Sequence, residues 1–250
     1  MNSASFLPHT ISSILNQGYP ALQYIVQDGG SSDTTLSIAQ EYGAKISHVN
    51  SGRDTGMSQA INRGFRHATG EIMAYLNSDD LLLPGSLDFA AYYFTAHPEV
   101  DVLYGHRVII NSQGQEIGRW VLPPHDADVL SWADYIPQET MFWRRRIWEK
   151  IGGQVDETFR FALDWDLLLR FREAGARFVR VPRFLGAFRV HEEQKTSREL
   201  EDLGASEMSR LRERYAGRPV SAEEVWHYLQ PYMHRHKVYH KLYRLGMLRY

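Results

Sequence analysis

The first hundred residues alternate two hydrophobic patterns. Apolar residues at Leu7, Ile11, Ile14 and Leu15 recur at the three-to-four-residue spacing of an amphipathic helix. Short apolar runs followed by turn-forming Gly, Asp, Asn or Ser are typical of buried strands. We expect strands at 22–26, 45–49 and 71–76, and further helices at 34–42, 59–67 and 85–97. This alternation predicts an α/β fold with a mainly parallel sheet flanked by helices.

The second half of the chain departs from this alternation. Two strand-like runs flank a turn sequence and predict a β-hairpin over 102–122. A loop-rich segment leads to a predicted helix at 164–174 and a strand at 178–181. From Ser197 onward the spacing is helical. We predict a first domain at 1–195 and a helical C-terminal extension at 196–250.

The composition excludes several classes of protein. The chain is 43% hydrophobic, as globular proteins are, and its net charge of -2 gives no signal for nucleic acid. It has no cysteine, which excludes disulfide frameworks, thiolate metal sites and thiol nucleophiles. No apolar run reaches the length of a transmembrane helix, and the N-terminus lacks the pattern of a secretory signal. We expect a cytoplasmic protein that binds no nucleic acid.

One apolar run ends in four polar residues, Asn77, Ser78, Asp79 and Asp80. Such a strand would deliver carboxylates to the edge at which open α/β sheets bind ligands. Adjacent carboxylates repel each other unless a cation or a donor lies between them. Mg²⁺ takes oxygen ligands from one or two carboxylates plus substrate phosphates, so it fits this position. The alternative is a solvated turn before the next helix, because Asp and Asn are common in turns.

Two further acidic clusters stand at predicted element ends. Asp28 precedes two glycines, which let a backbone approach a ligand closely. We expect Asp33 to cap the next helix and Asp28 to stay free to face a ligand. Asp164 and Asp166 open a predicted helix, where acidic residues are favoured without any functional reason. Asp166 also has the spacing to pair with Arg170.

Several catalytic motifs are absent. The chain has no G-x-G-x-x-G after a strand and no G-x-x-x-x-G-K-[ST], so the dinucleotide fingerprint and the P-loop are both missing. It also lacks the G-x-S-x-G nucleophile elbow. The chemistry that these absences leave open is phosphate chemistry that depends on a cation held by carboxylates.

Eight segments stand in a specific order along the chain: 6–7, 13–20, 24–33, 56–62, 68–72, 137–140, 161–170 and 188–191. Each segment is weak alone, but their order is specific. The ordered set resembles glycosyltransferase family 2, whose members have the GT-A fold, and the likeness covers about four fifths of the chain. The resemblance implies a GT-A domain with a mixed, mainly parallel sheet. It also implies sugar transfer, with inversion, from a nucleotide-diphosphate-sugar donor to a saccharide or lipid-linked acceptor.

The resemblance also implies roles for individual residues. Asp164 would be the general base that deprotonates the acceptor hydroxyl, a role that contributes ~10²–10⁴-fold to rate. The donor nucleotide would contact Asp28, Gly29, Arg53, Asp54, Asn77 and Ser78. A divalent metal, Mg²⁺ or Mn²⁺, would be bound by Asp79, Asp80 and His191. The acceptor side would include Gln138, Glu139 and Trp165. For His191 the alternative is an ordinary core or surface histidine.

Two departures from the family pattern suggest an alternative function. Asn77 stands where the metal-binding motif has its first Asp, which removes one charge. The family's first strand, central in the sheet and in contact with the nucleotide, has no counterpart before Asn2, so we expect a gap in the sheet. The main hypothesis is a transferase of surface polysaccharide or glycolipid biosynthesis. The alternative is a non-catalytic GT-A-like protein that binds a nucleotide or a partner.

The last twenty residues, 231–250, are rich in Tyr, His, Lys and Arg. A basic aromatic helix can lie on an anionic membrane surface, which would suit a lipid-linked acceptor at the inner face of the plasma membrane. The other interpretation is a helix that packs its aromatic side on the domain and leaves its basic groups solvated. The sequence favours the second interpretation.

Overall fold

The main sheet of the protein is mixed and has six strands. The computed structural model describes residues 1–191 and 203–250. The strand order is β3–β7–β5–β8–β4, and β6 pairs with β5. Their bounds are β3 Ile72–Met73, β4 Leu81–Leu82, β5 Val102–Ile110, β6 Glu116–Trp120, β7 Phe142–Arg144 and β8 Phe178–Arg189. Among the described residues of this sheet, β5 and β8 alone pair in parallel, and the other four pairings are antiparallel.

Parallel pairing is therefore less extensive than the sequence pattern suggested. The helix-strand alternation that implies parallel strands ends with α4 (Ser86–Ala96). The expected hairpin is confirmed as the antiparallel pair β5–β6. β7 follows loops and a short 3₁₀ turn, η2 (Gln138–Thr140), and enters the sheet antiparallel to both neighbours.

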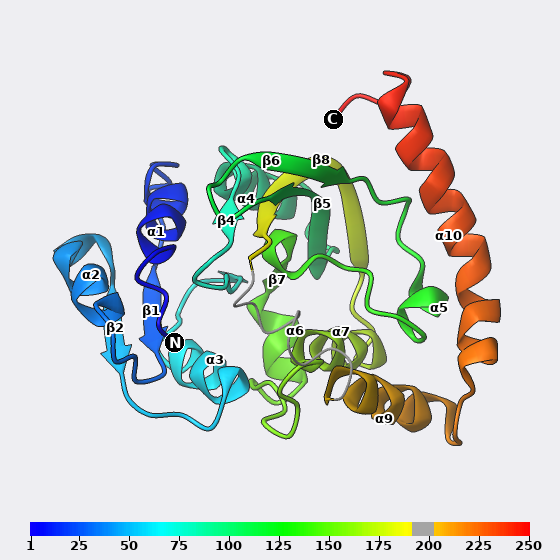
Figure 1. Ribbon diagram of the computed structural model, residues 1–250, viewed down its shortest axis with the longest axis horizontal. Helices are drawn as coiled ribbons and strands as arrows, with labels where there is room; N and C mark the ends of the chain where they lie inside the picture. Colours follow the sequence, from blue (N-terminus) through cyan, green and yellow to red (C-terminus); the bar gives the residue numbers. More distant parts are fainter. Residues whose placement is uncertain (192–202) are drawn as a thin grey trace.

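A second, two-stranded sheet lies apart from the first (Figure 1). It consists of β1 (Ile25–Asp28) and β2 (His48–Ser51), which pair in parallel. Helix α2 (Thr35–Glu41) and the short 3₁₀ helix η1 (Gly43–Lys45) connect them. Within 1–191 and 203–250, neither β1 nor β3 pairs with a strand along its second edge. The described strands therefore form two separate sheets, and a missing strand between them stays a prediction.

Helix α1 (Leu7–Leu15) bridges the two sheets. Ile11 is fully buried in the cluster that also contains Ile46, beside the two-stranded sheet. One turn later, Ile14 packs in a different cluster, with Leu82 of β4 and Phe94 of α4. The apolar face of α1 therefore holds together two sheets that share no backbone hydrogen bond ladder. Helix α3 (Met57–Phe65) packs against β1.

The strand expected over 71–76 is short because it has few pairing partners. β3 pairs with β7 at Ile72 and Met73 only, and no strand of the described chain pairs with β3 on its other side. Residues 74–76 continue without strand structure. By contrast, β8 extends well beyond the expected 178–181, because β5 pairs with it as far as Arg189.

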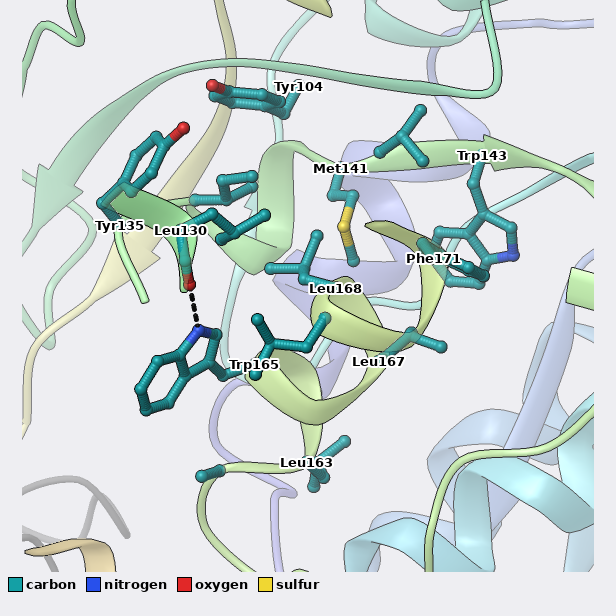
Figure 2. Close-up of a cluster of buried hydrophobic side chains, with 14 of the residues drawn as sticks. Tyr104, Leu130, Tyr135, Met141, Trp143, Leu163, Trp165, Leu167, Leu168 and Phe171 are labelled. Carbon is teal, nitrogen blue, oxygen red and sulfur yellow. Dashed lines mark hydrogen bonds between the residues drawn. The ribbon is translucent and has the colours of Figure 1, made fainter. Parts of the chain in front are cut away.

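The largest hydrophobic cluster lies between the main sheet and helix α7 (Leu163–Glu173), which occupies the place of the helix expected at 164–174. Figure 2 shows Leu167, Leu168 and Phe171 of α7 directed toward side chains that follow η2. Two of these, Met141 and Trp143, are almost fully buried. Helices α5 (Ala127–Leu130) and α6 (Arg145–Lys150) border this cluster. The core therefore fixes the N-terminal turn of α7 relative to the sheet.

The C-terminal part folds back onto the domain as two helices, α9 (Ala205–Ala216) and α10 (Ala222–Arg244). Helix α10 continues through Pro231, although a proline inside a helix removes one backbone hydrogen bond. Figure 1 shows α10 along the side of the molecule opposite α1 and α2. The predicted domain boundary at 195/196 lies outside the described residues. No helix among those residues is long and apolar enough to cross a membrane.

Candidate active site

The acidic turn after β3 is closed by its own backbone and anchored to β8. The N–H of Asp80 donates to the carbonyl of Asn77 at 3.2 Å. The Asp80 side chain is buried and accepts from the backbone N–H of Arg189 at 2.9 Å and from the Asn77 amide at 3.3 Å. Desolvation, together with the Glu139 and Asp79 carboxylates, raises the pKa of Asp80 well above its ordinary value.

Asp80 therefore does not present a ligand beside Asp79 as predicted. Its oxygens accept from protein donors, and the protonated form is favoured by burial among like charges. The sequence could not separate the two residues, because neighbours in a turn point in different directions. Ser78 is likewise engaged: its hydroxyl contacts that of Ser3 at 2.7 Å, and its carbonyl accepts from Thr10 at 2.9 Å.

Asp79 and His191 come together although 112 residues separate them. The Asp79 carboxylate and His191 Nε2 lie 3.0 Å apart, and the two side chains are 24% and 11% exposed. The Arg189 side chain donates to the Asp79 carbonyl at 2.7 Å, and the Phe6 ring lies 4.6 Å from the His191 ring. Two of the three predicted metal ligands thus share one position, because Asp79 precedes β4 and His191 follows β8, and these two strands pair in antiparallel fashion.

A divalent cation fits this pair only with ligands from elsewhere. Within 1–191 and 203–250, no group of three or more His, Asp or Glu side chains is arranged to hold a metal. Magnesium-type ions, however, are commonly bound by one or two carboxylates plus the phosphates of a substrate. The Asp79–His191 pair can supply such a partial site, and Asp80 does not complete it.

On the two-stranded sheet, Asp28 holds its own turn together. Its carboxylate accepts from the backbone N–H groups of Gly30 and Ser31, at 3.1 and 2.9 Å. It also accepts from the hydroxyls of Ser31 and Ser51, at 2.5 and 2.6 Å. Desolvation raises the pKa of Asp28, but these hydrogen bonds outweigh it and hold the pKa below its ordinary value. Asp28 is therefore not free to face a ligand, contrary to the prediction.

Asp33 and the loop that carries Arg53 and Asp54 both follow the Asp28 turn in the sequence, and both have contacts near it. Asp33 accepts from the backbone N–H of Thr35, the first residue of α2, at 3.0 Å, but the N-cap position itself is Thr34, so Asp33 contacts the helix start from one residue before the expected position. The loop that carries Arg53 and Asp54 packs against the Asp28 turn. A Cβ on Gly29 would lie 2.4 Å from the Asp54 carboxylate, so the two segments approach as closely as a glycine permits.

Asp164 stands in the first turn of α7 and is half-buried. The backbone N–H of Trp165 donates to its carboxylate at 3.0 Å. Desolvation by the surrounding protein raises the pKa of Asp164, opposed by backbone hydrogen bonds and the positive charge of Arg107. A carboxylate with a raised pKa that keeps some access to solvent has the properties of a general base.

The predicted acceptor residues Gln138 and Glu139 are buried in the wall of this region. The Gln138 side chain donates to the carbonyl of Tyr75 at 2.6 Å and accepts from the Asn77 amide at 3.4 Å. Glu139 forms a two-point ion pair with Arg107, at 2.7 and 2.5 Å. In this structure both side chains are buried: Gln138 joins η2 to the acidic turn and to Tyr75, and Glu139 joins η2 to Arg107 of β5.

Trp165 does not face an acceptor. Its side chain is fully buried, and its indole N–H donates to the carbonyl of Leu130 at 2.7 Å (Figure 2). A residue next to Asp164 at the start of a helix points about 100° away from it, and here that direction leads into the core. The prediction for Trp165 is therefore wrong.

Three residues near Asp164 were missed by the sequence analysis. Asp134 is exposed, but the surrounding protein and the Asp164 carboxylate raise its pKa well above the ordinary value. Arg107 compensates the buried Glu139 and lies near the same carboxylates. The Tyr75 hydroxyl is buried, and Asp164 and Asp134 raise its pKa further. Each stands in an element with no local motif, so only the spatial arrangement reveals them.

Comparison with solved structures identifies the class to which this fold belongs. The fold is the GT-A fold of glycosyltransferases. It superposes on Staphylococcus aureus TarS 1–349 in complex with UDP-GlcNAc with a TM-score of 0.70 at 19% identity, over 95% of this chain and 70% of that one. The mannosyltransferase PcManGT from Pyrobaculum calidifontis, in complex with GDP-Man and Mn²⁺, gives 0.66 at 20% identity, over 96% and 67%.

The sequence comparison places the chain within that class. Residues 1–160 match Glycosyl transferase family 2, and the protein belongs to this family. It is 29% identical over 174 residues to a PGL/p-HBAD biosynthesis glycosyltransferase of Mycobacterium bovis and spans 66% of that protein's length. It is 28% identical over 176 residues to the O-antigen biosynthesis protein RfbC of Myxococcus xanthus, which covers 69% of this chain and 14% of RfbC.

Proposed function

We propose that this protein transfers a sugar from a nucleotide-diphosphate-sugar donor to an acceptor hydroxyl with inversion, and that it depends on Mg²⁺ or Mn²⁺. The observation that carries the proposal is the contact between Asp79 and His191, delivered by two strands of a GT-A sheet. A divalent ion bound there would neutralise the charge of the departing diphosphate as a Lewis acid. Asp79 and His191 would supply two of its ligands.

The acceptor chemistry is assigned to Asp164. Its carboxylate would accept the proton of the acceptor hydroxyl as the oxygen attacks the anomeric carbon. The raised pKa brings the basicity of Asp164 closer to neutral pH, where a general base is most effective. A single attack from the face opposite the leaving diphosphate inverts the configuration at that carbon.

The biological process is proposed from the relatives, and the location from the sequence pattern. Two similar proteins act, by their names, in PGL/p-HBAD biosynthesis and in O-antigen biosynthesis. We propose that this chain also works in surface polysaccharide or glycolipid biosynthesis, in the cytoplasm, with a saccharide or lipid-linked acceptor.

Substitution of the proposed base tests the assignment. We expect Asp164→Asn to lower acceptor-dependent release of nucleoside diphosphate from UDP- and GDP-sugars by ~10²–10⁴-fold. Binding of UDP or GDP should stay unchanged, because Asp164 is assigned to the acceptor. Asp88→Asn is the matched control, since Asp88 is an exposed carboxylate in the first turn of α4. Acceptor-dependent release by Asp164→Asn at the wild-type rate would refute the role of Asp164.

A further inference from the structure

Helix α10 is held on the domain by one aromatic face. The Tyr228 ring stacks on Trp132 with a centroid distance of 4.0 Å and an interplanar angle of 3°. One turn later, Tyr232 is buried against the Tyr135 ring at 4.6 Å. Further along, Arg235 forms an ion pair with Asp126. The expectation that the aromatic side of this helix packs on the domain is therefore confirmed.

The opposite face of α10 carries both apolar and basic side chains. At 100° per residue, positions 226, 233, 237, 241 and 244 fall on one side of the helix, away from Tyr232. Trp226 is 54% exposed on this side. We call eight exposed residues of this side the outer face: Trp226, Met233, His234, Lys237, Val238, Lys241, Arg244 and Leu245. Exposed Glu223 lies on the same side, one turn before Trp226, in the first turn of the helix.

The charge of this region is opposite to that of the remaining chain. Residues 231–250 contain five Lys or Arg and no Asp or Glu, whereas the whole chain has a net charge of -2. In the part of the chain that the structure describes, Lys237, Lys241 and Arg244 take part in no ion pair. Arg235 differs, because Asp126 neutralises it on the inner side.

We propose that the outer face of α10 binds the surface of an anionic lipid bilayer. Lys and Arg on an amphipathic helix are attracted to anionic headgroups, while apolar side chains between them enter the headgroup boundary. Trp226 suits this position, since tryptophan is enriched at membrane interfaces. Because the aromatic face stays packed on Trp132 and Tyr135, the helix would bring the whole domain to the membrane without unfolding.

Other occupants fit less well. A second copy of the same face would bring like charges of Lys237 and Lys241 together, which costs free energy. A nucleic acid would satisfy the cations but leave Trp226, Val238 and Leu245 without an apolar partner. A bilayer satisfies both kinds of side chain at once.

Vesicle co-sedimentation of the protein tests the proposal. We expect binding to vesicles of phosphatidylcholine with phosphatidylglycerol, little binding to phosphatidylcholine alone, and weaker binding at high salt. Each basic residue near the surface contributes about fivefold to partitioning, so the double variant Lys237→Gln/Lys241→Gln should bind about 25-fold less. The matched control is Lys45→Gln/Arg66→Gln, which removes two exposed cations elsewhere.

The outcomes separate membrane binding from a merely solvated face. Equal binding of the Lys237/Lys241 variant and the control would overturn the proposal. So would the absence of binding to anionic vesicles, or binding to RNA alone. Trp226→Ala should weaken vesicle binding and leave the thermal unfolding midpoint unchanged, because Trp226 is exposed. None of these variants touches Asp79, Asp164 or His191, so the result is independent of the proposed sugar transfer.

Discussion

Glu207 of α9 is expected to stabilise the turn that carries Asp164. Its carboxylate accepts from three successive backbone N–H groups, those of Arg160, Phe161 and Ala162, at 2.9, 2.8 and 2.9 Å. These groups lead directly into α7, so the carboxylate also lies at the positive end of the helix dipole. The C-terminal extension thereby fixes the N-terminus of the helix on which the proposed base stands.

The magnitude follows from the burial of the three donors. Hydrogen bonds to a charged group contribute about 1.5–3 kcal/mol each, but water can replace the acceptor where a donor becomes exposed. Only the bond to Ala162 is buried, whereas those to Arg160 and Phe161 are partly exposed. We therefore expect Glu207→Ala to lower the free energy of unfolding by ~2–4 kcal/mol. The melting temperature should fall by roughly 4–16 °C.

Thermal and urea unfolding measure this effect directly. Glu207→Gln keeps one acceptor oxygen and should lose less stability than Glu207→Ala. Glu213→Ala, an exposed substitution in the same helix, should stay within ~0.5 kcal/mol of the wild type. If Glu207→Ala also stays within that range, the inferred coupling of α9 to the Asp164 turn is wrong.

Three further outcomes are expected. The kcat should fall on the acid side with a midpoint above pH ~4, because the raised pKa of Asp164 keeps this base protonated and inactive at pH values where an ordinary Asp is ionised. A midpoint at or below pH ~4 would contradict the buried environment assigned to Asp164. Gly186→Ala should cost ~1–3 kcal/mol, since a Cβ there would lie 2.4 Å from the Glu139 carbonyl oxygen, and an unchanged urea midpoint would refute this close packing. Amides of residues 74–76 should exchange hydrogen much faster than those of β5, because no strand of the described chain pairs with them; equal protection would show that they have a partner.

The sequence predicted the elements that depend on local pattern. The hairpin β5–β6 and helix α7 occupy nearly the expected positions, because apolar spacing and turn residues decide them locally. The extents of β3 and β8 were wrong for a non-local reason. The length of a strand depends on how far its partner pairs with it. The sequence alone does not show that β3 pairs with β7 or that β8 pairs with β5.

In the candidate site, too, the sequence predicted positions along the chain better than contacts between distant residues. His191 was grouped with Asp79 and Asp80 only through resemblance to a family, and the fold brings it within 3.0 Å of Asp79. Trp165 and Asp80 were misassigned because the pattern gives a residue's place in an element but not the direction of its side chain. Asp166 illustrates this further: it was expected to pair with Arg170, yet Arg214 of α9 lies closer, at 2.8 Å against 3.7 Å.

Calorimetric titration of UDP and GDP, with and without Mn²⁺, tests the central claim most directly. The claim is that Asp79 and His191 form a partial metal site completed by the donor diphosphate. It predicts that Mn²⁺ strengthens binding of one of the nucleotides to the wild-type protein, and that Asp79→Asn loses this dependence. Identical affinities with and without Mn²⁺, or full metal-linked binding by Asp79→Asn, would contradict it.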